Sequence, residues 1–101
     1  MTVATEFHGS VASIILSGDV DYSLQEEVRN ASQQALSAEQ VSEIQVDFSG
    51  VKFLDSSVIR ALITLRRDAD AAGKSLTLLN CNKTVREVFE IGGFDRMFTF
   101  R

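Results

Sequence analysis

Residues 43–73 (EIQVDFSGVKFLDSSVIRALITLRRDADAAG) contain the change of hydrophobic period that decides the fold. The stretch 43–48 alternates apolar and polar side chains, as a half-buried strand does. Further on, apolar side chains recur every three or four residues, which predicts a helix over roughly 57–72 with Gly73 as its stop. An acidic residue and two hydroxyl residues, Asp55-Ser56-Ser57, therefore stand where a strand leads into a helix.

The segments before this stretch predict a hairpin and a first helix. Residues 2–7 and 11–16 have strand character and are joined by a short glycine-containing loop, which favours a β-hairpin. Gly18-Asp19-Val20-Asp21 is expected to break the second strand, and Asp21 is placed to cap a helix that begins near Tyr22. Apolar residues at steps of four, three and four indicate that helix: Leu24, Val28, Ala31 and Ala35.

The segments that follow continue the alternation of strands and helices. Ser49-Gly50 is predicted to turn the strand 43–48, residues 75–79 to form a strand and residues 84–91 a short helix, and the apolar tail 94–100 can hold a last strand. Strands that alternate with helices pair in parallel through right-handed crossovers. The predicted fold is therefore α/β: a single small domain over residues 1–101, with a mixed, mostly parallel β-sheet of four to five strands covered by helices.

Composition restricts the class of function. The chain has 101 residues, 45% of them hydrophobic, and a formal net charge of −4. This acidic balance argues against nucleic acid as a partner and against direct membrane binding. No apolar run approaches the length of a membrane span, and no secretory signal is recognisable. Cys81 is the single cysteine, so we expect no disulfide and a reducing, cytoplasmic location.

The chain also lacks the residue sets that catalysis requires. His8 is the single histidine, no Gly-x-Ser-x-Gly motif occurs, and no glycine-rich loop ends in Gly-Lys-Ser/Thr. One histidine and one cysteine do not make a metal site. We therefore expect no enzyme activity, no cofactor and no metal, with His8 a loop residue and Cys81 a small buried apolar group.

Two interpretations of Asp55-Ser56-Ser57 remain open from the residues alone. The first is a helix N-cap, in which a side-chain oxygen accepts a backbone N–H and contributes about 0.5–2 kcal/mol. The second is a regulatory site, because a helix N-terminus tolerates a phosphate and a phosphoserine adds a charge of about −1.5 to −2. Such a charge would exclude a partner that fits the neutral surface.

Three stretches of the chain share the motifs of one known family. Residues 16–21 end a strand in Gly, an acid, an aliphatic residue and Asp, and residues 46–57 hold a strand, a loop and an Asp-Ser pair before the central helix. Residues 91–94, with Met97 and Phe98, form a C-terminal helix-Gly-aromatic ending. In these motifs the chain resembles the STAS domain family, and its bacterial anti-sigma factor antagonists (anti-anti-sigma factors) in particular. One residue departs from the pattern, because Val58 occupies a position that is usually Gly. We expect this β-branched residue to restrict the approach of a partner.

The resemblance implies a phosphorylation-controlled partner switch. The unphosphorylated chain would bind an anti-sigma factor with serine kinase activity and so release a sigma factor, and a phosphatase would reverse the phosphorylation. Carried over by position, Ser56 is the phosphorylation site, and Asp21, Asp55, Ser56 and Ser57 are the partner-binding residues. Asp21 as a simple helix cap is the competing reading.

Two other hypotheses are weighed against this one. The chain could be a non-enzymatic STAS subunit of a lipid or anion transporter complex, and the Val58 departure makes that alternative more credible. A small hydrolase or nucleotide-using enzyme is disfavoured by the missing catalytic base and phosphate loop.

Overall fold

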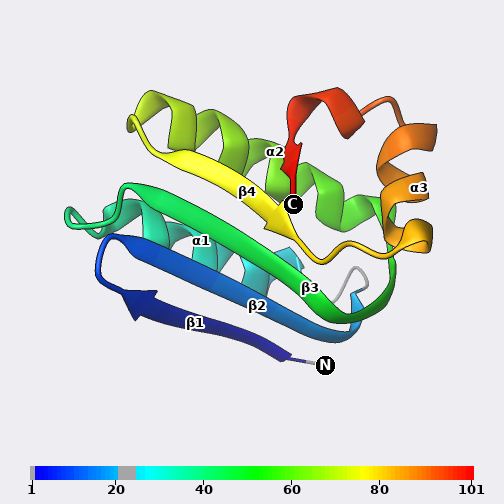
Figure 1. Cartoon of the computed structure of the whole chain (residues 1–101), viewed down its shortest axis with the longest axis horizontal. Coiled ribbons are helices and arrows are strands. Elements are labelled where there is room, and N and C mark those ends of the chain that lie inside the picture. Colours follow the sequence, from blue (N-terminus) through cyan, green and yellow to red (C-terminus); the bar gives the residue numbers. More distant parts are fainter. Residues whose placement is uncertain (1, 21–24) are drawn as a thin grey trace.

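The computed structural model describes residues 2–20 and 25–101 and has the predicted α/β architecture. Five strands form one sheet in the order β1-β2-β3-β4-β5 (Figure 1). β1 pairs antiparallel with β2, and every later neighbour pairs in parallel. The elements in chain order are β1 (Thr2–His8), β2 (Val11–Val20), α1 (Gln25–Ser37), β3 (Glu43–Leu54), α2 (Ser56–Ala71), β4 (Ser75–Leu79), α3 (Lys83–Ile91), the short 3₁₀ helix η2 (Asp95–Met97) and β5 (Thr99–Phe100).

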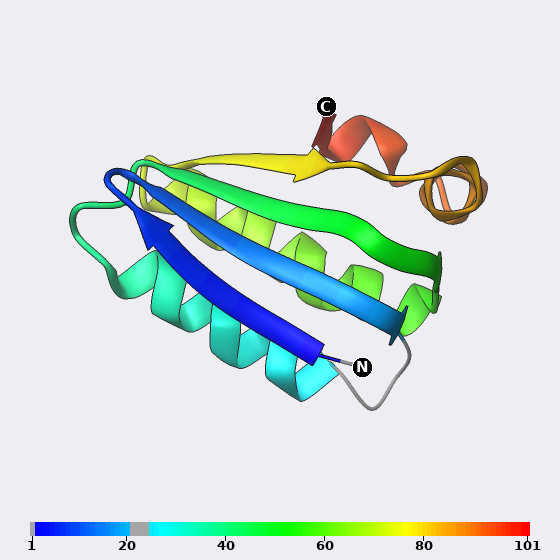
Figure 2. The same ribbon diagram turned by 60° about the horizontal axis from the view of Figure 1, so that its bottom comes forward.

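The periodicity of the sequence accounts for the layers. α1 and α2 lie on the same face of the sheet (Figure 2). Alternate strand residues face these helices and are buried, whereas their neighbours, such as Ser13 and Gln45, are only half-buried. The strand residues that supply the core are Ala12, Ile14, Leu16, Ile44, Val46, Phe48, Val51, Leu54, Leu76 and Leu78.

The C-terminal part of the chain is held by an aromatic cluster. The buried ring of Phe89 in α3 makes edge-to-face contacts with Phe48, Phe98 and Phe100, with ring centroids 6.4, 5.3 and 5.4 Å apart. Edge-to-face pairs at such distances add to the free energy gained by burial. The apolar tail therefore does hold a last strand, β5, as its composition predicts.

The predicted turn at Ser49-Gly50 is wrong, because β3 continues through both residues to Leu54. Gly50 lies beside Ser17 of β2, and a Cβ atom at Gly50 would come within 3.0 Å of the Ser17 Cβ. The glycine thus permits a close approach of two strands and does not reverse the chain.

The predicted break at Gly18–Asp21 begins too early, because β2 continues through Gly18 and ends at Val20. Instead, the pairing of β2 with β3 shifts register twice, between Ile15 and Ser17 and between Gly18 and Val20. Gly18 adopts the left-handed φ of 82° that glycine accommodates without strain. These irregularities curve the end of the pair and set where β3 delivers the chain to α2.

Candidate functional site

Asp55 is the N-cap of α2, which settles the first of the two interpretations of the junction. Its backbone is extended, with φ −78° and ψ 136°, and its carboxylate accepts a hydrogen bond of 2.8 Å from the backbone N–H of Ser57. One of the unpaired donors of the helix N-terminus is therefore satisfied by an acid. Ser56 is the first helical residue and Ser57 the second, so neither serine is needed as the cap.

The two serines differ in accessibility. Ser56 is exposed and lies in the first turn of α2. Ser57 is half-buried, and its hydroxyl oxygen is buried without a hydrogen bond of good geometry to any described residue. Of the pair, Ser56 is the one whose hydroxyl a second protein can reach.

Val58 points into the core and is fully buried. The expectation that this β-branched residue restricts the approach of a partner is therefore wrong, because its side chain is not on the surface. A valine at this helical position costs little, since its packing against the core compensates for its modest helix propensity.

The Asp55 carboxylate adds negative charge beside Ser56. The backbone N–H of Ser57, with a smaller contribution from the Ser57 side chain, holds the pKa of Asp55 below its usual value against a slight opposing effect of burial. Asp55 is consequently ionised at neutral pH, next to the positive end of the α2 dipole.

Ser56 and Ser57 line a shallow hollow of about 300 Å³ together with Gln25 of α1 and Arg60 of α2. Arg60 follows Ser56 by four residues, so the two side chains lie on one face of the helix. Sequence reasoning missed Arg60, although the spacing of four residues from Ser56 was available as a signal. The site thus combines an accessible hydroxyl, a carboxylate, a helix N-terminus and a guanidinium group.

Asp21, the remaining residue assigned to partner binding, lies outside the described residues. The structure therefore gives no geometry for it, either as a helix cap or as a partner contact.

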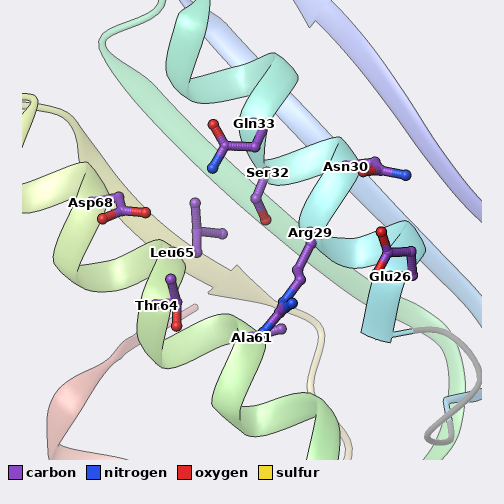
Figure 3. Close-up of a pocket in the computed structure, with 9 residues that line it drawn as sticks. All are labelled: Glu26, Arg29, Asn30, Ser32, Gln33, Ala61, Thr64, Leu65 and Asp68. Carbon is purple, nitrogen blue, oxygen red and sulfur yellow. The ribbon is translucent and has the colours of Figure 1, made fainter.

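A second hollow, of about 350 Å³, lies between α1 and α2. In Figure 3, Arg29 reaches from α1 toward Ala61 of α2. Glu26 lies beside it on α1, and Asp68 lines the hollow from α2. The buried Ser32 hydroxyl at this hollow donates a hydrogen bond of 2.7 Å to the Val28 carbonyl, so it is already used within α1. The mixed charges that line this hollow are those of an ordinary solvated helix surface.

No other described residues form a group with obvious chemistry. The expectation that His8 is a loop residue is wrong, because it is the last residue of β1 and pairs with Val11. Its side chain is exposed, and its Nε2 lies 3.1 Å from Glu6 Oε1. Over residues 2–20 and 25–101, no three His, Cys, Asp or Glu side chains gather as metal ligands would. No described helix is long and apolar enough to cross a membrane.

Comparisons with known proteins agree with this architecture. The family model described as "Mlab, STAS domain" matches residues 3–99. A STAS-domain-containing protein of Pseudomonas aeruginosa is 26% identical over 98 residues, which cover 97% of this chain and 95% of that protein. The anti-sigma F factor antagonist of Lysinibacillus sphaericus is 30% identical over 80 residues, which cover 79% of this chain and 68% of that protein.

Solved structures give the same result. The unphosphorylated anti-sigma factor antagonist SpoIIAA superposes with a TM-score of 0.83 at 26% identity, over 99% of this chain and 88% of that one. SpoIIAA of Bacillus in its phosphorylated form superposes with a TM-score of 0.76 at 25% identity, over 99% of this chain and 91% of that one.

Proposed function

Because the chain belongs to the STAS domain family, we propose that it is an anti-sigma factor antagonist controlled by phosphorylation of Ser56. In this role it acts by binding and catalyses no reaction. The unphosphorylated chain binds an anti-sigma factor that is also a serine kinase, in the cytoplasm, and thereby frees a sigma factor. A phosphatase restores the binding state.

The contrast between Ser56 and Ser57 is the observation that carries this proposal. The Ser56 hydroxyl is exposed at the first position of α2, whereas the Ser57 hydroxyl is buried. A kinase needs an accessible hydroxyl as its acceptor, so Ser56 is the phosphorylation site and Ser57 supports the surface around it. Asp55 fixes this geometry by capping the helix, which leaves the serine side chain free.

Phosphorylation acts on the interface and leaves the fold in place. Transfer of the ATP γ-phosphoryl group to the Ser56 oxygen releases the hydroxyl proton and leaves ADP. The product carries a charge of about −1.5 to −2 at the helix N-terminus, where the positive end of the helix dipole tolerates an anion. The Asp55 carboxylate stands beside it, so a partner that docks here must compensate two adjacent negative groups.

Binding residues follow from the same geometry. Asp55, Ser56 and Ser57 are the partner-binding residues at the start of α2, and Asp21 is proposed as a fourth on the basis of the family pattern alone. The sequence alternative, a STAS subunit of a transporter complex, would use this surface for a permanent contact without a kinase.

The experiment that tests the proposal is a kinase reaction read by intact-mass spectrometry. Candidate kinases are the anti-sigma factors encoded in the same genome. We expect one added phosphate on the parent chain and on Ser57→Ala, and none on Ser56→Ala. Ser56→Asp should imitate the phosphorylated state by weakening the anti-sigma factor complex.

Two outcomes count against the proposal. Full phosphorylation of Ser56→Ala would show that the acceptor is another residue. Failure of every such kinase to modify the chain, together with stable binding to a transporter subunit, would replace the proposal with the transporter alternative.

A further inference from the structure

β1 is an open edge of the sheet. Thr2–His8 pair in unbroken antiparallel register with β2, from Thr2 with Ser17 to His8 with Val11, and β1 stands at one end of the strand order (Figures 1 and 2). Proteins usually protect an exposed edge with lysine, proline or a bulge. The seven residues of β1 contain no lysine or proline, and their register is continuous.

An exposed aromatic side chain sits on this edge strand. Phe7 is 43% exposed although it pairs with the fully buried Ala12 of β2. Residues paired across two strands share a face, so Phe7 lies on the face of the sheet that α1 and α2 cover elsewhere. Val3 and Thr5 share that face, because they pair with the buried Leu16 and Ile14.

The same edge also has a hollow. A depression of about 330 Å³ lies between β1 and α1, and its lining residues are Val3, Thr5, Glu27, Asn30, Ala31 and Gln34. Val3 and Thr5 form its β1 side, so the hollow lies on the face that carries Phe7. One strand thus presents a protruding ring near its C-terminal end and a recess near its N-terminal end.

We propose that β1 pairs with β1 of a second copy of this chain, antiparallel about a twofold axis at Thr5. Thr5 is the middle residue of β1, so this register pairs all seven residues. It sets Phe7 opposite Val3 of the other copy, where the ring enters the hollow. The twofold axis generates the same contact between Val3 of the first copy and Phe7 of the second, as an isologous interface requires.

This register also keeps the Glu6 carboxylates from facing each other directly and keeps Phe7 on the correct face of the sheet. Glu6 lies opposite Ala4 of the other copy, so the two carboxylates are not directly opposed. A shift of the register by one residue would move Phe7 to the wrong face of the sheet. The same strand carries both the Phe7 ring and the hollow that receives it, at positions that come opposite each other when two copies of β1 pair. This self-complementarity favours a second copy of the chain over an unrelated extended peptide.

The dimer should be weak and reversible, because two short strands with one ring each bury a small area. The test is sedimentation velocity of the full chain over a concentration series reaching about 500 µM, together with Phe7→Ser and Phe53→Ser. Phe53 is the matched control, since it is 46% exposed and lies at the far end of β3. We expect the parent and Phe53→Ser to dimerise alike, and Phe7→Ser to raise the dissociation constant about tenfold or more.

A cross-link tests the register in the parent fold. In a Cys81→Ala background, Thr5→Cys places two cysteines directly opposite each other, with Cα atoms about 4.5–5.5 Å apart, within the range that a disulfide spans. Glu6→Cys is the control, because its two copies become diagonal neighbours about 7–8 Å apart. Mild oxidation should link Thr5→Cys and leave Glu6→Cys monomeric.

Three results would overturn the proposal. A chain that stays monomeric throughout the series, equal dimerisation of Phe7→Ser and the parent, or equal cross-linking of both cysteine variants would each contradict it. None of these readouts involves Ser56 or a kinase, so the proposal can fail while the antagonist function stands.

Discussion

Lys74 provides the sharpest test of how the helix layer is assembled. It follows Gly73 at the end of α2, yet its Nζ reaches the C-terminus of α1 and donates to the carbonyls of Leu36 at 2.9 Å and Ala38 at 2.7 Å. A third contact, to the Ala35 carbonyl, is longer at 3.4 Å. α1 has no basic residue in its last turn, so this distant lysine supplies the positive charge that a helix C-terminus favours.

The cost of losing this contact can be bounded. A hydrogen bond to a charged group contributes about 1.5–3 kcal/mol, and ordering a lysine side chain costs up to about 2 kcal/mol. Two good bonds at a half-buried site, with some solvent screening, leave a net contribution of about 2 kcal/mol. In a domain of this size, that loss lowers the melting temperature by roughly 8–16 °C.

Urea denaturation of Lys74→Met, followed by far-UV circular dichroism, measures this loss. Methionine keeps the apolar stem and removes the charge and its three donors. Lys52→Met is the matched control, because Lys52 is exposed on β3 and its side chain makes no hydrogen bond or ion pair with described residues. If both variants lose the same free energy of unfolding, the account of the α1–α2 contact is wrong.

Three further predictions concern single side chains. Burial alone would raise the pKa of Asp47, but hydrogen bonds from Asn80 and the Ser49 backbone N–H outweigh it and lower that pKa. The ionised Asp47 should therefore stabilise the fold above about pH 4, and this stabilisation should be lost as the pH falls through the pKa of Asp47 in the folded chain. The difference in unfolding free energy between the parent and Asp47→Asn should accordingly close on acidification. Gly50→Val should destabilise the chain by about 1–3 kcal/mol in urea, because its Cβ would crowd Ser17; unchanged stability would mean that the strands can separate at no cost. Burial raises the pKa of Cys81 to about 11 from 9.0, so alkylation by iodoacetamide at about pH 8 should be roughly 100-fold slower in the folded chain than in urea, and equal rates would refute the burial of the thiol.

The fold was largely predictable because periodicity records burial. The helices α2 and α3 lie within one residue of their predicted positions because each contains a clear period of three to four, and the short apolar run 75–79 forms the predicted strand. The prediction failed at Gly50, because glycine is favoured both in turns and where two strands approach closely. Gly50 looks like a turn residue in sequence, yet its lack of a Cβ is used against Ser17, a contact that exists only after β2 and β3 pair.

The candidate site was predictable in position but not in detail. The acid-hydroxyl-hydroxyl run at a strand–helix junction located it, and family resemblance selected Ser56. Which residue caps the helix depends on whether the carboxylate of Asp55 or a hydroxyl reaches a backbone N–H, a choice of side-chain rotamer that spacing does not contain. The contact of Lys74 with the C-terminus of α1 joins residues more than thirty positions apart in the sequence, so no local pattern predicts it.

The affinity of the anti-sigma factor for the chain before and after phosphorylation tests the central claim most directly. Isothermal titration calorimetry would compare the parent chain with the same chain carrying phosphoserine at position 56, incorporated during synthesis so that no kinase is needed. An uncompensated charge at an interface costs about 2 kcal/mol or more, so the account predicts binding that is about 30-fold weaker or worse for the phosphorylated chain. Equal affinity of the two forms would contradict it.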